Sequence, residues 1–119
     1  MQISSPMIDT LGKYLDLTTD QLKLTAENMA NVDTPGYKTQ GIDFEQELAR
    51  QLNSISTAGT DPRVTAVDGL VARPDGNNVS MDREGMQLAK AQLQFKLGVD
   101  LIKGEFSQIM SAIHSADGK

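Results

Sequence analysis

The feature that most constrains this chain is an apolar repeat with a seven-residue interval near its C-terminal end. Four large apolar residues recur at that interval and three more share their helical face: Leu88, Phe95, Ile102 and Ile109, with Val99, Phe106 and Ile113. Such an interval is typical of a long helix that buries one continuous stripe. The sequence therefore predicts a helix over residues 80–119, with Ser80 or Asp82 as N-cap and Asp82 and Glu84 in or near its first turn.

The same segment has apolar residues on a second side. These form another line along the predicted helix: Met86, Ala89, Leu93, Leu97 and Leu101. Gly98 and Gly104 lie inside the segment, where each costs about 0.5–1 kcal/mol of helix stability relative to Ala. Both glycines are expected to be notches at which another backbone approaches, and hinges are the alternative.

A second long helix is predicted over residues 7–30. Its main stripe consists of Ile8, Leu11, Leu15, Leu22 and Met29, and a second apolar line roughly opposite consists of Tyr14, Leu17 and Leu24. Pro35 disfavours a helical Thr34, and Gly36 accepts positive φ, so the helix should end before these residues. A helix with two apolar lines has two surfaces to bury.

The middle of the chain is more polar. Phe44, Leu48 and Leu52 repeat every four residues and predict a short amphipathic helix over Asp43–Asn53. Residues 54–78 are rich in Gly, Pro, Asp and Asn, and we expect a loop or short extended arm there, much of it disordered in the free protein.

The predicted fold is mainly α, with two long terminal helices paired as an antiparallel hairpin or coiled coil. A short helix and a flexible or extended polar segment separate them. We expect one unit over residues 1–119, divided into the first helix (1–31), the middle (32–79) and the last helix (80–119). A hairpin hides only one face of each helix, so the remaining apolar lines require other subunits. The stripe of Leu88, Phe95, Ile102, Phe106, Ile109 and Ile113 could be an internal core, an assembly seam, or both.

Composition narrows the possible functions. Aromatic residues are only 4% of the chain and Trp is absent, which predicts a weakly stable monomer. The net charge of -5 makes nucleic acid and anionic lipid poor partners. The first residues lack a basic start followed by an apolar run, so we expect no cleaved signal peptide.

No catalytic, cofactor or metal site is predicted. His114 is the only histidine and has no second ligand in a motif, so it is expected at the surface. The acidic pairs Glu45 with Glu47 and Asp82 with Glu84 fit exposed helix surface better than acid–base chemistry. The turn at Asp75 lacks the further ligands of a calcium loop.

The segment from Ala26 to Lys38 reads Ala-Glu-Asn-Met-Ala-Asn-Val-Asp-Thr-Pro-Gly-Tyr-Lys. It resembles the N-terminal signature of the flagellar axial proteins of the rod, hook and hook junction. The motif positions are Asn28, Asn31, Thr34, Pro35, Gly36 and Tyr37. The run from Asp75 to Glu84 is similar to the proximal rod members of that family. The chain also has no room between Gln40 and Asn78 for the β-rich insertion of the distal members.

The resemblance implies a structural subunit of the bacterial flagellar basal body, without enzymatic activity or cofactor. Such a subunit is exported unfolded through the type III apparatus and packs its terminal helices into the periplasm-spanning rod. Its expected partners are copies of itself, other rod proteins and the membrane-ring or export-gate end of the basal body. Asn and Thr of the motif would cap backbone groups, and Tyr37 would anchor the turn.

Two other interpretations fit parts of the sequence. One is a sibling proximal rod protein. The other is a soluble helical adaptor or export chaperone of the flagellar system, for which the acidic charge and the exposed apolar lines are suitable. The motif after Ala26 favours the rod.

Overall fold

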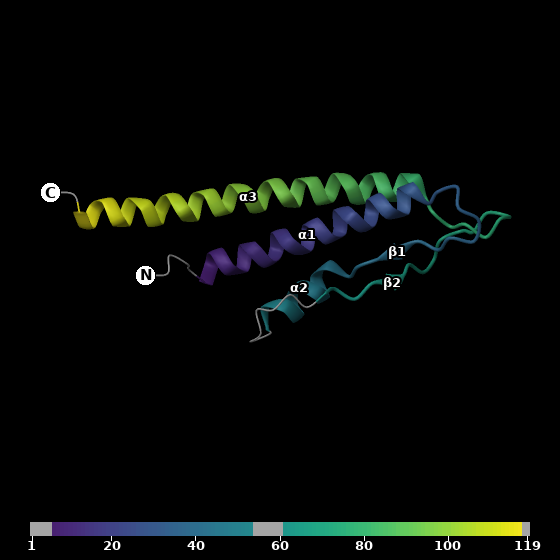
Figure 1. The fold of residues 1–119 in the computed structure, drawn as a ribbon, viewed down its shortest axis with the longest axis horizontal. Helices are drawn as coiled ribbons and strands as arrows, with labels where there is room; N and C mark the ends of the chain where they lie inside the picture. The colour runs from purple at the N-terminus through teal and green to yellow at the C-terminus, as the bar shows by residue number, and fades with distance from the viewer. Residues whose placement is uncertain (1–5, 54–60, 118–119) are drawn as a thin grey trace.

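The molecule is an elongated helical hairpin with a smaller layer on one side. The computed structural model describes residues 6–53 and 61–117. The elements are α1 (Pro6–Ala30), β1 (Gln40–Gly41), α2 (Phe44–Leu52), β2 (Thr65–Ala66) and α3 (Met81–Asp117). Figure 1 shows α1 and α3 side by side and antiparallel, in a molecule that measures 72 × 27 × 18 Å. The predicted mainly α fold with two long terminal helices is confirmed.

The start of α3 follows from its N-cap. The Ser80 hydroxyl accepts a hydrogen bond from the Arg83 backbone N–H at 3.2 Å, and the Ser80 carbonyl accepts one from the Glu84 N–H at 2.9 Å. The first bond satisfies a backbone donor that the first turn leaves without a helical partner, and the second is the first bond of the regular helix. Of the two predicted caps, Ser80 is therefore the correct one.

α1 is the central layer, between α3 on one side and α2 with the two short strands on the other (Figure 1). The Tyr14 and Phe44 rings meet edge to face, with centroids 5.5 Å apart, and the Lys13 ammonium donates to the Gln51 carbonyl at 3.1 Å. Leu17 and Leu24, from the second apolar line of α1, are 0% and 6% exposed. That line is buried within the chain, so the expectation that it needs another subunit is wrong.

The middle segment is built on local caps and one short strand pair. The Asp43 carboxylate caps α2 by accepting from the Gln46 N–H at 3.2 Å, in agreement with the predicted short helix. β1 and β2 pair antiparallel, with Gln40 opposite Ala66 and Gly41 opposite Thr65. The part of the predicted arm over residues 54–60 lies outside the described residues.

Gly98 and Gly104 play different roles in α3. A Cβ on Gly98 would lie 2.6 Å from Leu15 Cδ2 and 3.1 Å from Tyr14 Cδ1, so the absence of a side chain lets α1 pack closely there. A Cβ on Gly104 would meet no atom within 4 Å. Gly98 is the predicted notch, whereas Gly104 forms no notch within this chain.

Large apolar side chains remain exposed along α3. In the predicted stripe, Leu88, Ile102 and Ile109 are half-buried, while Phe95, Phe106 and Ile113 are exposed. The second line is more open, because Met86 and Leu93 are 74% and 69% exposed. The stripe is therefore only partly an internal core. In the described ranges, no helix is long and apolar enough to cross a membrane.

We predict opposite effects of filling the two glycine positions. Gly98→Val should lower the free energy of unfolding by about 1–3 kcal/mol, because the new side chain collides with Leu15. Gly104→Ala should raise it by about 0.5–1 kcal/mol through helix propensity alone. Urea unfolding followed by circular dichroism measures both. Equal effects at the two positions would contradict the assignment of Gly98 as the contact point.

Candidate functional site

Buried polar side chains gather where α1 ends and α3 begins. We call this region, made of residues 28–40 and 73–84, the polar junction; it lies at the loop end of the hairpin in Figure 1. Four of its polar side chains are at most 1% exposed: Asn28, Thr39, Asn77 and Glu84. Buried polar groups are stable only when they are hydrogen-bonded, so their partners explain how the region folds.

Asn28 uses the full hydrogen-bonding capacity of its amide. Its Nδ2 donates to the Gln40 carbonyl at 2.8 Å and to Glu84 Oε1 at 2.7 Å. Its Oδ1 accepts from the Gln40 N–H at 3.1 Å and from the Tyr37 hydroxyl at 2.9 Å. One side chain thus joins α1 to the following turn, to β1 and to the first turn of α3.

Glu84 is a buried carboxylate with two partners. Its Oε1 accepts from Asn28, and its Oε2 lies 2.6 Å from Nη1 of Arg83. A buried charge of this kind is tolerated when it is paired and hydrogen-bonded, and losing one partner is strongly destabilising. Glu84 therefore fixes the start of α3 against the end of α1.

Asn77 connects the arm to the turn after α1. Its Nδ2 donates to the carbonyls of Asn31 and Thr34, both at 2.8 Å. Its Oδ1 accepts from the Val79 N–H at 2.8 Å. The segment before α3 is thereby attached to the turn that carries the motif.

Two glycines allow a close approach of backbone segments in the junction. Gly36 and Gly76 have φ of 76° and 85°, a region that other residues rarely adopt, and a Cβ on Gly76 would lie 3.4 Å from Gly36 Cα. The Gly36 N–H donates to the Asp75 carbonyl at 2.9 Å. Around them, the Arg73 guanidinium donates to the carbonyls of Val32 and Val79, and the Lys38 ammonium donates to that of Gly76.

The six predicted motif residues all lie in this junction. The predicted packing stripe lies along α3 instead. Asn28 and Tyr37 take part in the central network, as their side chains meet at Oδ1 and OH. Asn31 Nδ2 donates to the Glu27 carbonyl at 2.8 Å, and Thr34 Oγ1 donates to Asn31 Oδ1 at 3.0 Å, both near the surface. Pro35 is exposed. An assembly role for these residues stays a prediction.

Two members of the site, Glu84 and Asn77, are not predicted as such from the sequence. The expectation of exposed helix surface is wrong for Glu84 and also for Glu47 of α2, because both side chains are buried. The sequence places Glu84 at the favourable dipole end of α3, yet this acid precedes Leu88 by four residues and the buried Ala91 by seven. An acid in line with a buried helix face is a signal for a polar partner. Asn77 has the sequence context of a turn, and no local pattern shows which carbonyls it binds.

The arrangement holds segments together, since its polar atoms are already engaged. Among the described residues, every buried side-chain nitrogen and oxygen has a hydrogen-bond partner. That part of the chain also contains no group of three His, Asp or Glu placed to hold a metal ion. Burial raises the pKa of Tyr37, and the carboxylates of Glu27 and Glu84 raise it further.

Asn28→Ala should destabilise the fold more than any exposed motif change. It removes the buried hydrogen bonds to Glu84 Oε1 and to both backbone groups of Gln40, and we expect a loss of about 2–4 kcal/mol. Asn31→Ala is the matched control and should cost less than about 1 kcal/mol, because its bonds are solvent-exposed. Chemical unfolding measures both; a loss at position 28 no larger than at 31 would contradict the central role of Asn28.

Alkaline pH should weaken the junction through Tyr37. Its folded-state pKa exceeds that of the unfolded chain, so the unfolded state loses its proton first and the stability it provides declines as pH rises above about 10. Tyr37→Phe should cost about 0.5–1.5 kcal/mol at pH 7. Thermal midpoints at increasing pH should fall more steeply for the wild type than for Tyr37→Phe. Parallel profiles would show that Tyr37 does not titrate differently on folding.

Comparison with known proteins gives one consistent result. No model of a protein family matches the chain. The chain is 31% identical to the flagellar basal body rod protein FlgB of Escherichia coli K12, over 87% of this chain and 89% of the relative. It is 33% identical to FlgB of Cereibacter sphaeroides, over 88% and 94%. It is 26% identical to FlgB of Bacillus subtilis 168, over 95% and 97%. The chain therefore belongs to the FlgB family of flagellar basal body rod proteins.

Proposed function

We propose that this chain is a structural subunit of the proximal rod, the part of the flagellar drive shaft nearest the membrane, and that it acts by packing without catalysis. The observation that carries the proposal is the exposed apolar surface of α3. Met86, Leu93 and Leu97 are 74%, 69% and 52% exposed, along a helix of 37 residues. A long apolar helix surface of this kind is typical of an interface with other subunits.

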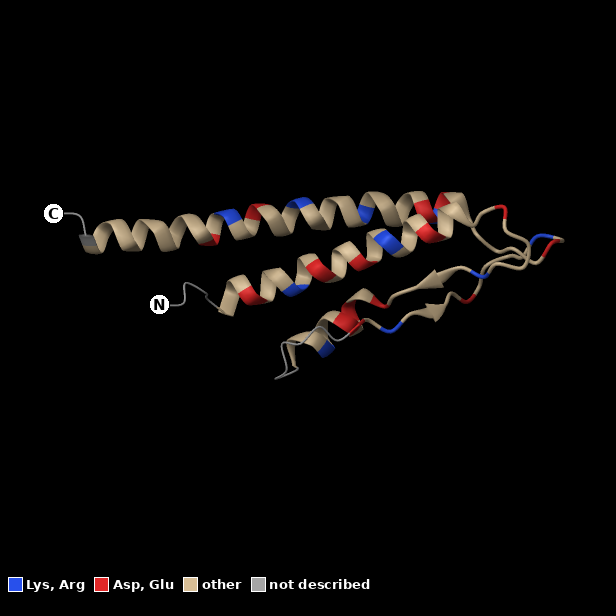
Figure 2. Ribbon diagram, in the orientation of Figure 1, with Lys and Arg blue, Asp and Glu red and all other residues tan. Residues whose placement is uncertain are grey.

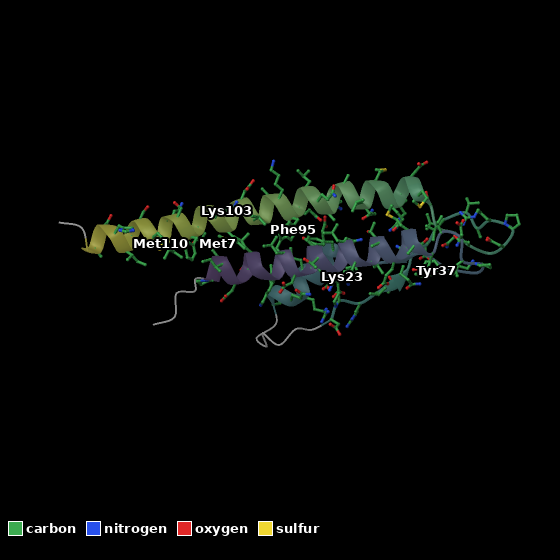
Figure 3. All side chains as sticks on the ribbon, turned by 45° about the horizontal axis from the view of Figure 1, so that its top comes forward. Met7, Lys23, Tyr37, Phe95, Lys103 and Met110 are labelled. Carbon is green, nitrogen blue, oxygen red and sulfur yellow. The ribbon has the colours of Figure 1, made fainter. Side chains whose placement is uncertain are left out.

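The proposed partners are copies of the chain, other flagellar rod proteins, and the membrane-ring or export-gate end of the basal body. Figure 3 shows the side chains along α3, with Phe95, Lys103 and Met110 labelled on it. Helices that complete their burial only next to a neighbour gain stability by mass action when they assemble. Nucleic acid and lipid are not proposed as partners, in view of the net charge of -5.

The proposal includes passage through the flagellar export apparatus in an unfolded state, into the periplasm-spanning rod. The absence of cysteine, and therefore of disulfides, supports it. So does the small core: in the described residues, the buried apolar side chains are Leu11, Leu17, Leu24, Val79 and Ala91. A chain with few buried apolar side chains is easier to keep unfolded during transport.

Charged substitutions on the exposed line of α3 should stop assembly without unfolding the chain. In a strain deleted for the gene, Leu93→Glu with Leu97→Glu should fail to restore swimming, whereas the wild-type gene restores it. Gln46→Glu, at an exposed position of α2, is the matched control and should restore swimming. Circular dichroism should show unchanged helicity in both variants, because these side chains are exposed in the monomer.

Sedimentation of purified basal bodies separates the proposal from its alternative. A rod subunit sediments with them, whereas an adaptor or export chaperone stays in the cytoplasm. A deletion strain that still builds complete rods and swims would overturn the proposed function.

A further inference from the structure

A pair of lysines on α3 and a pair of aspartates on α1 have the same seven-residue spacing. Lys96 and Lys103 are exposed on α3, and Asp9 and Asp16 are exposed on α1. The ion pairs within the described part of the chain are Glu47 with Arg50 and Arg83 with Glu84, so all four of these charges are without an ion-pair partner. Figure 2 shows the charged positions along both helices.

The hairpin register places the two charge pairs at the same levels. Glu84 contacts Asn28 at the junction, and Gly98 packs on Leu15 and Tyr14 farther along. Because the helices are antiparallel and rise equally per residue, Lys96 lies about level with Asp16, and Lys103 about level with Asp9.

Within one copy these charges point away from each other. Gly98 faces α1, and Lys96 is two residues away, which is about 160° around the helix. Leu15 and Tyr14 face α3, and Asp16 is displaced from Leu15 by about 100° and from Tyr14 by about 200°. The lysines and the aspartates therefore lie on different outward sides of the hairpin.

The lysines border an apolar groove. Its volume is about 390 Å³, and it is lined by Leu22 of α1 and by six residues of α3: Gln92, Phe95, Lys96, Val99, Asp100 and Lys103. The α1 surface between Asp9 and Asp16 contains Gly12, where an added Cβ would meet nothing within 4 Å. That surface has little side-chain bulk and can approach a groove closely. Asp100, between the two lysines, is level with Gly12 and would face no carboxylate there.

We propose that two copies of this chain pack side by side in the same orientation, with the Asp9–Asp16 surface of one copy against the Lys96–Lys103 groove of the next. Asp16 then faces Lys96, and Asp9 faces Lys103. This proposal rests on the proposed rod function and specifies one of its contacts. Because each copy uses two different surfaces, the contact can continue from copy to copy, around a ring or along a helix.

The charge pattern favours a second copy as the occupant. The two carboxylates match the two ammonium groups in number, interval and level, with no axial shift between the copies. Matched charges across an interface select the partner and its register more than they add affinity.

Charge exchange tests the contact directly. Sedimentation velocity would compare the wild type with Lys96→Glu/Lys103→Glu, with Asp9→Lys/Asp16→Lys, and with the variant that carries all four changes. Each double variant should associate about ten-fold more weakly than the wild type, and a mixture of the two should associate better than either alone. The variant with all four substitutions has the wild-type net charge and should recover association. Lys90→Glu, beside the separate groove at α2, is the control and should behave as wild type.

Cross-linking in assembled rods provides a second measurement. The chain has no cysteine, so Asp16→Cys/Lys96→Cys introduces the only thiols. Oxidation of purified basal bodies should give covalent oligomers of this chain, and Asp16→Cys/Lys90→Cys should not. If the wild type is monomeric in solution, this measurement decides.

Two results would overturn the proposal. One is that the variant with all four substitutions associates as weakly as the double variants. The other is that rods contain the Asp16→Cys/Lys96→Cys variant but no cross-linked copies. Cross-links from the thiol introduced by Lys96→Cys to a different rod protein would overturn it as well and would identify that protein as the occupant. In each case the chain is still found in rods. Absence of the chain from basal bodies would instead refute the proposed function.

Discussion

The hydrogen bonds of Asn28 set the register of the whole hairpin. The apolar positions of α1 and α3 recur at intervals of seven, so sliding one helix by seven residues would again bring apolar residues together. Asn28 and Glu84 are 56 residues apart in sequence and can meet in only one such alignment. Any other alignment buries an amide and a carboxylate without partners. The buried hydrogen bond between Asn28 and Glu84 thus selects one alignment among several that the apolar stripes would allow.

Gly98 confirms this register at a second level. The close approach of Leu15 and Tyr14 at that position requires the absence of a side chain on α3, and only one alignment places Gly98 opposite them. The contacts at these two levels fix the axial position of α3 relative to α1. Every outward-facing residue on the two helices therefore has a defined position, as a subunit needs if its neighbours are to recognise it.

Local signals predict the helices and part of the site. The seven-residue interval of α3 and its Ser80 cap lie within or beside the element that they define, and the motif identifies Asn28 and Tyr37, which are nine residues apart. Contacts between distant segments could not be predicted in this way. The contact of Tyr14 with Phe44 requires the α2 layer to fold back on α1, and Asn77 binds a carbonyl 46 residues away. Because backbone carbonyls carry no sequence information, such a partner is visible only in three dimensions.

The distribution of buried groups also has a consequence for assembly. The junction is densely hydrogen-bonded, while Phe95, Phe106 and Ile113 on α3 are 40%, 50% and 40% exposed in the single chain. The buried hydrogen bonds that help to hold the register are thus concentrated at one end of the molecule. The shaft of α3 completes its burial only beside a neighbour, and a species that binds the folded chain alone stabilises it more as its concentration rises. The junction can therefore define the shape of the subunit before assembly, and assembly can then supply the stability that the small core of the single chain does not provide.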